Sequence, residues 1–231
     1  MDTLSPSDPV DLLVVGAGPI GLACALEATR AGLTARVVEK GALVNSLVGY
    51  PTQMEFFSTP ELLEIGGHPL ATTYYKPRRE EAIDYYRAVA QREGLDIRLG
   101  ERVERVDGER GAFTVVTSKA THAARAVALA TGFFDQPNRI GVPGEDLPHV
   151  AHYYKEPYPF SGRRVVIVGA KNSAAKAALE INRHGGHATL IVRGPEITTS
   201  VKYWIRPDLL NRIGEGSISA YYHTTVETIT D

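Results

Sequence analysis

Residues 11–39 read D-L-L-V-V-G-A-G-P-I-G-L-A-C-A-L-E-A-T-R-A-G-L-T-A-R-V-V-E, and this stretch decides the fold. The apolar run 12–15 predicts a buried parallel strand, and the residues rich in alanine and leucine after it predict a helix that ends before Gly32. The run 36–38 predicts a second strand, which Glu39 closes. Strand, glycine turn, helix and strand in this order form the βαβ fingerprint of dinucleotide binding in the context that it requires.

Each glycine of the turn has its own physical role. Gly16 permits the tight turn, Gly18 lets the backbone approach a pyrophosphate, and Gly21 lets helix and strand pack closely. The start of the helix offers free N–H groups and a positive dipole end to phosphates. Glu39 is placed to accept hydrogen bonds from a ribose. We therefore expect a bound dinucleotide, and the simpler alternative is an ordinary glycine-rich turn.

A second unit of the same kind follows later in the chain. The run 164–168 predicts a strand, G-A-K-N-S-A at 169–174 predicts the turn, and 189–192 predicts the next strand, closed by Arg193. Lys171 replaces the middle glycine of the fingerprint, which weakens this motif taken alone. Two such units in one chain are more specific than either. They indicate a flavin on one and a nicotinamide on the other, or less often two nucleotides in a non-redox role.

The residues that close the two second strands differ in charge. Glu39 would repel a 2′-phosphate, so the first unit should take FAD or NAD. Arg193 would pair with a 2′-phosphate, so the second unit should take NADP. The alternative for Arg193 is a solvated surface arginine.

An insertion and an antiparallel meander are predicted between the two units. The long non-periodic segment 40–77 is either a surface excursion or, as its length favours, a segment that wraps a cofactor. A helix is expected at 78–93 and a third strand at 96–99. Three short runs predict the meander, at 102–106, 113–117 and 121–124. A closing strand at 126–130 leads to Thr131-Gly132, which fits a flavin-binding domain.

Composition narrows the class of protein. The chain has 231 residues, 43% of them hydrophobic, and a net charge of −2, so nothing suggests a nucleic-acid partner or an anionic membrane. Cys24 is the single cysteine, so no internal disulfide can form, which suits a reducing cytosol. No apolar run approaches the roughly 20 residues of a membrane helix, and the N-terminus is unlike a signal peptide. We expect a cytoplasmic protein without a metal site.

Six stretches carry a resemblance to a known family: V-V-G-A-G-P-I-G-L-A at 14–23, Y-P-T-Q-M-E-F-F-S-T at 50–59, L-E-I-G-G at 63–67, A-T-G-F-F-D at 130–135, G-V-P-G-E-D-L-P at 141–148 and V-G-A-K-N-S-A at 168–174. Through them residues 9–231 resemble the bacillithiol disulfide reductase family, flavoproteins similar to low-molecular-weight thioredoxin reductases. Lys171 is typical of that family, so it no longer counts against NADP binding.

The resemblance implies two cofactors, FAD and NADPH, and a set of residues for each. FAD would lie along Gly16, Gly18, Pro19, Ile20 and Gly21, with Glu39 and Lys40 at the adenosine ribose, Val103 near the adenine, Asn45, Ser46 and Thr52 on the flavin side, and Thr131-Gly132 closing the site. NADPH would meet Gly169, Lys171, Asn172, Ser173, Ala174 and Arg193, with Lys202 as a second phosphate partner.

The predicted fold is α/β, with two Rossmann-like dinucleotide-binding domains of the three-layer FAD/NAD(P)-binding type, each with an antiparallel β-meander. We expect an FAD-binding domain at residues 1–135, an interdomain crossing at 136–162 and an NADPH-binding domain at 163–231. T-T-V-E-T-I-T-D at 224–231 matches the start of the first meander, and the chain ends there. The return segment that such enzymes normally carry is missing, so we expect a fragment or an incomplete gene product.

Two positions depart from the patterns of thiol-dependent relatives. Thioredoxin reductases carry C-x-x-C where this chain has H-Y-Y-K-E at 152–156, and bacillithiol-type relatives carry a cysteine at the position of Ile20. Cys24, one helical turn from Ile20, is a conceivable displaced nucleophile. Its apolar surroundings favour a buried core cysteine instead. No catalytic residue is therefore assigned.

The expected activity is an FAD-dependent NADPH oxidoreductase. Hydride would pass from NADPH to the flavin, and electrons would pass to a low-molecular-weight disulfide. The alternatives are a thioredoxin-reductase-like NADPH:ferredoxin reductase, which needs no protein thiol, and a non-catalytic dinucleotide-binding fragment. A flavin monooxygenase is less favoured. The expected partner is a small-molecule or small-protein electron acceptor, and proteins of this class often form homodimers.

Overall fold

The computed structural model describes residues 8–52 and 54–231. The chain divides into two compact units, residues 1–136 and 137–231. This division groups residues 137–162 with the second unit. Both units combine helices with mainly parallel strands, which makes the protein α/β. None of the helices in the described part of the chain is long and apolar enough to cross a membrane.

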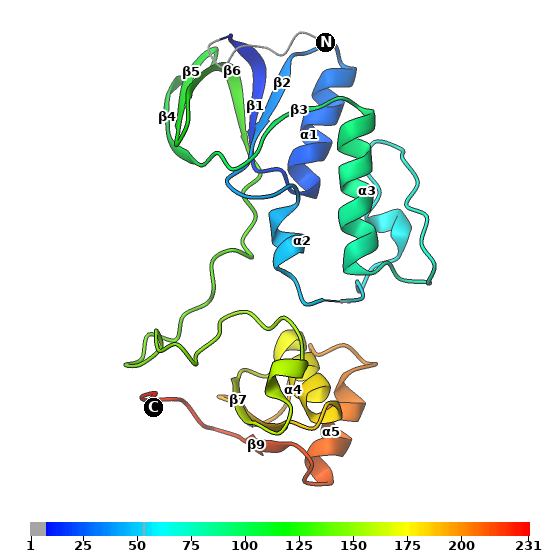
Figure 1. Ribbon diagram of the computed structural model, residues 1–231, viewed down its shortest axis with the longest axis vertical. Coiled ribbons are helices and arrows are strands. Elements are labelled where there is room, and N and C mark those ends of the chain that lie inside the picture. The colour runs from blue at the N-terminus through cyan, green and yellow to red at the C-terminus, as the bar shows by residue number, and fades with distance from the viewer. Residues whose placement is uncertain (1–7, 53) are drawn as a thin grey trace. The chain divides into compact units, whose positions relative to one another are not determined.

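The first unit is built on a six-stranded sheet with the strand order β3-β2-β1-β6-β5-β4 (Figure 1). Its strands are β1 (Val10–Val15), β2 (Ala35–Val38), β3 (Asp96–Arg98), β4 (Val103–Glu109), β5 (Ala112–Thr117) and β6 (Thr121–Leu129). The neighbours β3, β2, β1 and β6 pair in parallel, and β6, β5 and β4 pair antiparallel.

Strand β6 takes the place of two elements that the sequence pattern separates. The runs 121–124 and 126–130 predict a meander strand and a closing strand, but one continuous strand forms both. Ala124 lies opposite Phe113 in the antiparallel ladder and opposite Val10 in the parallel ladder. Arg125, which interrupts the apolar run, is exposed and pairs with Asp11 at 3.1 Å, so it does not end the strand.

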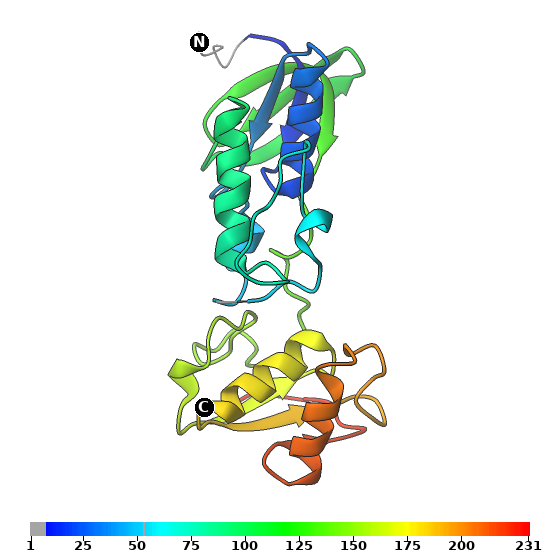
Figure 2. The same cartoon turned by 90° about the vertical axis from the view of Figure 1, so that its right-hand side faces the viewer.

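Hydrophobic clusters lie on both faces of the parallel strands in the first unit. Helices α1 (Pro19–Arg30) and α3 (Arg79–Arg92) cover one face, where Leu22 and Tyr86 pack with Val14 (Figure 2). Two shorter helices, α2 (Asn45–Gly49) and η1 (Pro60–Leu62), belong to the segment between β2 and α3. On the other face Val115 of β5 packs with Leu13 of β1.

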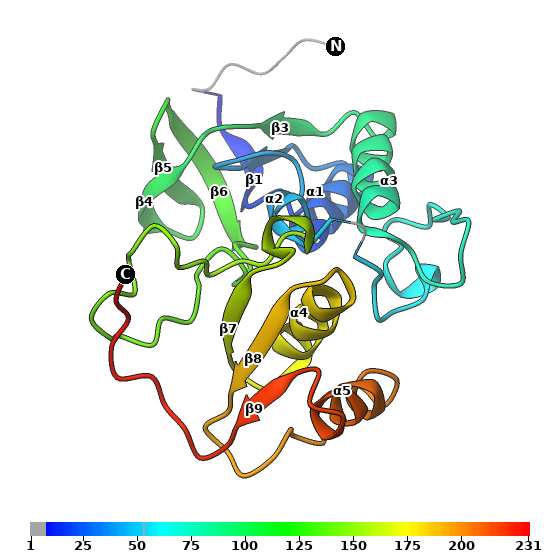
Figure 3. The same cartoon turned by 60° about the horizontal axis from the view of Figure 1, so that its bottom comes forward.

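The second unit is a three-stranded parallel sheet with helices on one face (Figure 3). Its elements are η2 (Tyr158–Phe160), β7 (Arg164–Val168), α4 (Asn172–Arg183), β8 (His187–Ile191), α5 (Arg206–Gly214) and β9 (Ser219–Tyr221). Leu190 of β8 packs with Leu179 of α4 and Leu209 of α5, so the core lies between sheet and helices.

The second unit lacks the antiparallel meander that the similarity between the chain's two halves predicts. Residues 224–231 form no strand in the described chain, and the Ile229 N–H donates instead to the Pro143 carbonyl, 2.9 Å away. In the first unit β4 is held by its ladder with β5. A meander strand without such a partner has no ladder to join, so the matching sequence 224–231 does not adopt the strand.

Candidate functional site

The three glycines of the turn after β1 differ in what surrounds them. Gly16 has φ 108°, and a Cβ added to it would lie 2.5 Å from the Ala130 carbonyl oxygen. A Cβ on Gly21 would overlap the Gly16 carbonyl oxygen. A Cβ on Gly18 would meet no protein atom within 4 Å, although the backbone there is extended, with φ −75° and ψ 176°. The protein leaves open space beside Gly18 at the start of α1, so the turn fits a pyrophosphate.

Glu39 is buried at the end of β2 and braces this turn. Its Oε2 accepts the Ala17 N–H at 2.9 Å, and its Oε1 accepts the Gly41 N–H at 2.8 Å. Each carboxylate oxygen keeps a further acceptor site, since an ionised carboxylate offers about four lone-pair positions. Glu39 therefore fixes the turn and retains capacity for a ribose hydroxyl.

The segment after β6 runs beside α2 and brings predicted residues from distant parts of the chain together. Asp135 pairs with Lys40 Nζ at 2.8 Å and accepts the Ser46 hydroxyl at 3.5 Å. The ring of Phe134 meets Tyr50 edge-on, with centroids 4.6 Å apart. Thr131-Gly132 follows β6 and lies next to the glycine turn, between that turn and Phe134.

The remaining predicted residues of the first unit, apart from Thr52, lie at the starts of helices and strands. Pro19 and the exposed Ile20 open α1, and Asn45 opens α2, with its Oδ1 accepting the Ala42 N–H at 3.2 Å. Val103 opens β4 and lies two residues after Glu101, whose N–H donates to the Glu39 carbonyl at 2.8 Å. Thr52 is exposed in the loop after α2.

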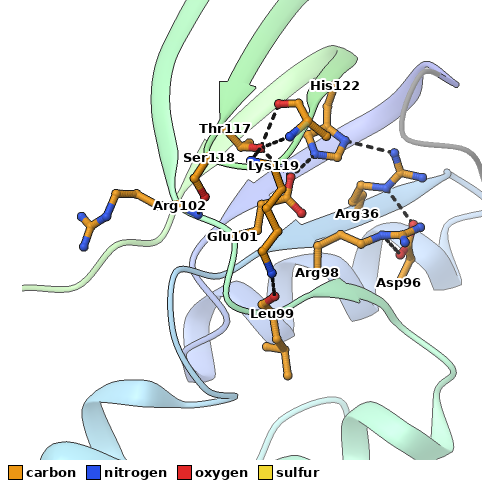
Figure 4. A network of polar contacts seen from close by, with 11 residues as sticks. Arg36, Asp96, Arg98, Leu99, Glu101, Arg102, Thr117, Ser118, Lys119 and His122 are labelled. Atoms are coloured by element: carbon orange, nitrogen blue, oxygen red, sulfur yellow. Dashed lines mark hydrogen bonds and ion pairs between the residues drawn. The ribbon is translucent and has the colours of Figure 1, made fainter.

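A buried polar network that the sequence did not indicate lies in the first unit (Figure 4). The fully buried Arg36 donates from Nε to Asp96 at 2.8 Å, and its Nη1 lies 3.2 Å from His122 Nδ1. His122 Nε2 lies 2.7 Å from Glu101 Oε1, which also accepts the Thr117 hydroxyl at 2.6 Å. Because Nδ1 faces a guanidinium donor, it is placed to accept, and Nε2 is placed to donate to Glu101.

Glu101 couples this network to pH. Burial raises the pKa of Glu101, but the hydrogen bonds from Thr117 and His122 outweigh burial and leave the pKa below its ordinary value. A carboxyl whose folded pKa is depressed stabilises the fold above its unfolded pKa, and this contribution disappears as the pH falls through the folded pKa.

Replacing Glu101 by glutamine should therefore destabilise the first unit most at neutral pH. We expect a loss of about 1.5–3 kcal/mol at pH 7, the scale of hydrogen bonds to a charged group. The difference from the wild type should shrink in acid, below the ordinary carboxyl pKa. Urea unfolding across this pH range measures it, with the exposed Glu104→Gln as control. A Glu101→Gln loss that is the same at every pH would contradict the account.

Backbone hydrogen bonds show which residues of the second unit occupy the same positions as residues of the first unit. The Gly169 N–H donates to the Ile191 carbonyl at 3.0 Å, as Gly16 does to Val38 at 2.8 Å. One residue further, Val192 donates to Tyr221 at 2.9 Å, as Glu39 does to Arg98. Val192 therefore corresponds to Glu39, and Arg193 corresponds to Lys40. The sequence comparison, which set Arg193 against Glu39, was one residue out of register.

The turn after β7 places the predicted nicotinamide-side residues at the start of α4. Gly169 has φ 131°, and a Cβ there would lie 3.6 Å from the Ala174 Cβ, so the backbone angle rather than space requires glycine. Lys171 and Ser173 are exposed, and so is Arg193. Asn172 Oδ1 accepts the backbone N–H of Lys202 at 2.9 Å, which brings Lys202 to this turn.

Cys24 departs in part from its prediction. It is half-buried rather than fully buried, but it packs against the main hydrophobic cluster of the first unit. Four residues earlier, at the position of the cysteine in bacillithiol-type relatives, the side chain of Ile20 is 71% exposed. The exposed start of α1 therefore presents an apolar side chain, and the thiol sits one turn inside.

A protein-family model, a curated relative and a solved structure all match most of the chain and indicate the same kind of protein. Residues 13–231 match the family described as pyridine nucleotide-disulphide oxidoreductase. The chain is 41% identical over 220 residues to the bacilliredoxin reductase Bdr of Bacillus subtilis, covering 95% of this chain and 68% of that protein. The solved structure of bacillithiol disulfide reductase Bdr (YpdA) from Bacillus cereus superposes with a TM-score of 0.94 and 39% identity, covering 96% of this chain and 70% of that one.

A more distant relative is a ferredoxin–NADP reductase from Thermus thermophilus. It is 32% identical over 201 residues, which cover 82% of this chain and 55% of that protein. The chain therefore spans little more than half the length of this relative.

Proposed function

Because the chain belongs to the pyridine nucleotide-disulphide oxidoreductase family, we propose that it reduces a low-molecular-weight disulfide, of which bacillithiol disulfide is the first to test. As a member it is an NADPH-dependent flavoprotein oxidoreductase, and its cofactors are FAD and NADPH. The observation that carries the substrate proposal is the 41% identity to a bacilliredoxin reductase, which extends over both glycine turns.

We assign FAD to the first unit and NADPH to the second, each unit acting as one Rossmann-like domain. Gly18 and Glu39 support the first assignment, since one leaves room for a pyrophosphate and the other presents acceptors for a ribose. Gly169 and Arg193 support the second. When bound, the two cofactors supply the redox chemistry, a hydride passing from nicotinamide to flavin. The chain's own residues bind and orient them.

Replacing Arg193 by alanine should reduce NADPH use selectively. A charge-assisted pair with a 2′-phosphate contributes about 1.5–3 kcal/mol, so kcat/KM for NADPH should fall by on the order of tenfold or more. NADH use should stay nearly unchanged. Steady-state kinetics with both cofactors measure this. Arg164→Ala, an exposed arginine at the opposite end of the strands, is the control, and equal losses with both cofactors would make Arg193 structural.

Replacing Cys24 by alanine should leave catalysis nearly intact. The sequence has one cysteine, and it packs in the core rather than at the exposed start of α1. A cysteine packed against the core contributes packing rather than chemistry, so flavin reduction and turnover should stay within about threefold of the wild type. Loss of disulfide reduction with persistent flavin reduction would instead assign the thiol chemistry to Cys24.

The exposed Ile20 favours a second candidate, an NADPH:ferredoxin reductase, because such an enzyme needs no protein thiol. The two candidates separate in one assay of the FAD-loaded protein. NADPH oxidation driven by bacillithiol disulfide supports the disulfide reductase. Turnover with one-electron acceptors and none with disulfides supports the ferredoxin reductase. A cytoplasmic location and a homodimer remain predictions for the same protein.

A further inference from the structure

A lysine and a tryptophan form a pair beside the start of α4. The backbone N–H of Lys202 donates to Asn172 Oδ1 at 2.9 Å, and Asn172 is the first residue of α4. Lys202 Nζ lies over the indole ring of Trp204, 5.7 Å from its centroid. The Tyr203 ring meets the same indole edge-on at 4.8 Å. A cation on an aromatic face therefore lies next to the turn that fits a dinucleotide.

Core packing does not explain these aromatic residues. Val201 and Ile205, which flank the segment, are buried in the hydrophobic cluster of the second unit. Trp204 and Tyr203 are 41% and 82% exposed, and neither belongs to that cluster. The two buried anchors fix the backbone, and the side chains between them are presented to the outside.

The loop that leads from β8 to this pair has a cation at each end, Arg193 and Lys202. Arg193 is the second residue after β8, and the chain returns at Lys202 to the first residue of α4. The start of a helix and two cations form an environment that favours phosphate groups. Arg193 binds by a planar fork, whereas Lys202 is a point charge on a flexible stem that loses rotamer freedom when it binds.

We propose that Trp204 is a positioning residue for NADPH. Its ring holds the Lys202 ammonium in place, so that Lys202 and Arg193 together bind the adenosine 2′-phosphate. Tryptophan offers the best aromatic face for a cation, and an ammonium already held there has less freedom to lose on binding. This inference rests on the NADPH site proposed above. It predicts that Trp204 favours NADPH and has little effect on NADH, which lacks the 2′-phosphate.

The test is calorimetric binding of NADPH and of NADH to the full FAD-loaded chain. Trp204→Leu should weaken NADPH binding about fivefold, the scale of an exposed cation–π contact, and NADH binding less than about twofold. Trp204→Phe, which keeps an aromatic face, should restore most of the loss. The control is Tyr158→Leu. Tyr158 is also an exposed aromatic residue, and it packs edge-on against His184 at the other end of α4.

A double-mutant cycle separates positioning from packing. In a Lys202→Met background, Trp204→Leu should have no further effect on NADPH binding, because the ring has no ammonium to hold. The same loss in both backgrounds, or equal losses with NADPH and NADH, would overturn the proposal and leave the NADPH site standing. A wild-type chain that binds no NADPH would overturn the site itself, and this inference with it.

Discussion

Replacing Gly18 by valine is expected to abolish FAD binding while the first unit stays folded. The Gly18 backbone is extended, a conformation that any residue adopts, and an added Cβ meets no protein atom within 4 Å. The valine side chain would instead occupy the space of the pyrophosphate. A clash of about 3 kcal/mol already weakens binding roughly a hundredfold, and a whole valine side chain in the pyrophosphate's space costs more than that, so the protein should purify without flavin. The flavin absorbance of the purified protein and its thermal unfolding measure the two effects separately.

The matched control is Gly214→Val, another glycine whose Cβ would meet no atom within 4 Å. It lies at the end of α5 in the second unit and should leave FAD in place. A Gly18→Val protein that purifies with its full flavin content would show that the pyrophosphate does not approach this turn. The assignment of FAD to the first unit would then be wrong.

Replacing Gly21 by alanine, three residues away, is expected to destabilise the fold itself. The new Cβ would overlap the Gly16 carbonyl oxygen; the backbone fixes the position of the Cβ and the oxygen is a backbone atom, so neither can rotate aside. Relief requires α1 to move away from β1, which disturbs the contact of Leu22 with the core. We expect a loss of about 3 kcal/mol or more in the free energy of unfolding, the upper range for overpacking.

Denaturant unfolding of the apoprotein measures this loss, because it removes any contribution of bound FAD to stability. Gly18→Val in the same experiment should unfold with the wild type. The two variants together test why one motif needs glycine at both positions. Equal stability of the Gly21→Ala protein and the wild type would show that helix and strand have room to spare.

Local sequence patterns predicted the elements that depend on local physics. Both βαβ units are recognisable because a glycine turn and an apolar run lie within one short stretch. Pairing between distant strands is less local. Nothing in the apolar run at 126–130 tells that it continues the strand begun at Thr121, because Ala124 gains partners from both β5 and β1.

The position of Arg193 shows how a single residue of register changes a side chain's surroundings. Counting from an apolar run sets Arg193 against Glu39, whereas the hydrogen bonds set Val192 there. Val192 is buried and Arg193 is exposed, so one residue of register exchanges a core position for one open to a ligand. The charge argument for NADPH survives this correction, because Arg193 still follows the strand at the ligand edge.

The buried network was beyond sequence reasoning. Arg36 lies in the strand A-R-V-V. An arginine at such a position is expected at the surface, yet Arg36 is fully buried. Its partners Asp96 and His122 lie 60 and 86 residues further along the chain. Pairing of β2 with β3 brings Asp96 beside Arg36, and β6 brings His122 there. The sequence shows a charged residue inside a short apolar strand, but nothing in it predicts which residues pair with that charge.

An anaerobic titration of the FAD-loaded protein with NADPH tests the central claim most directly. The account predicts that stoichiometric NADPH removes the absorbance of oxidised flavin, that NADH is far less effective, and that bacillithiol disulfide restores the absorbance. A flavin spectrum that excess NADPH leaves unchanged would contradict the account.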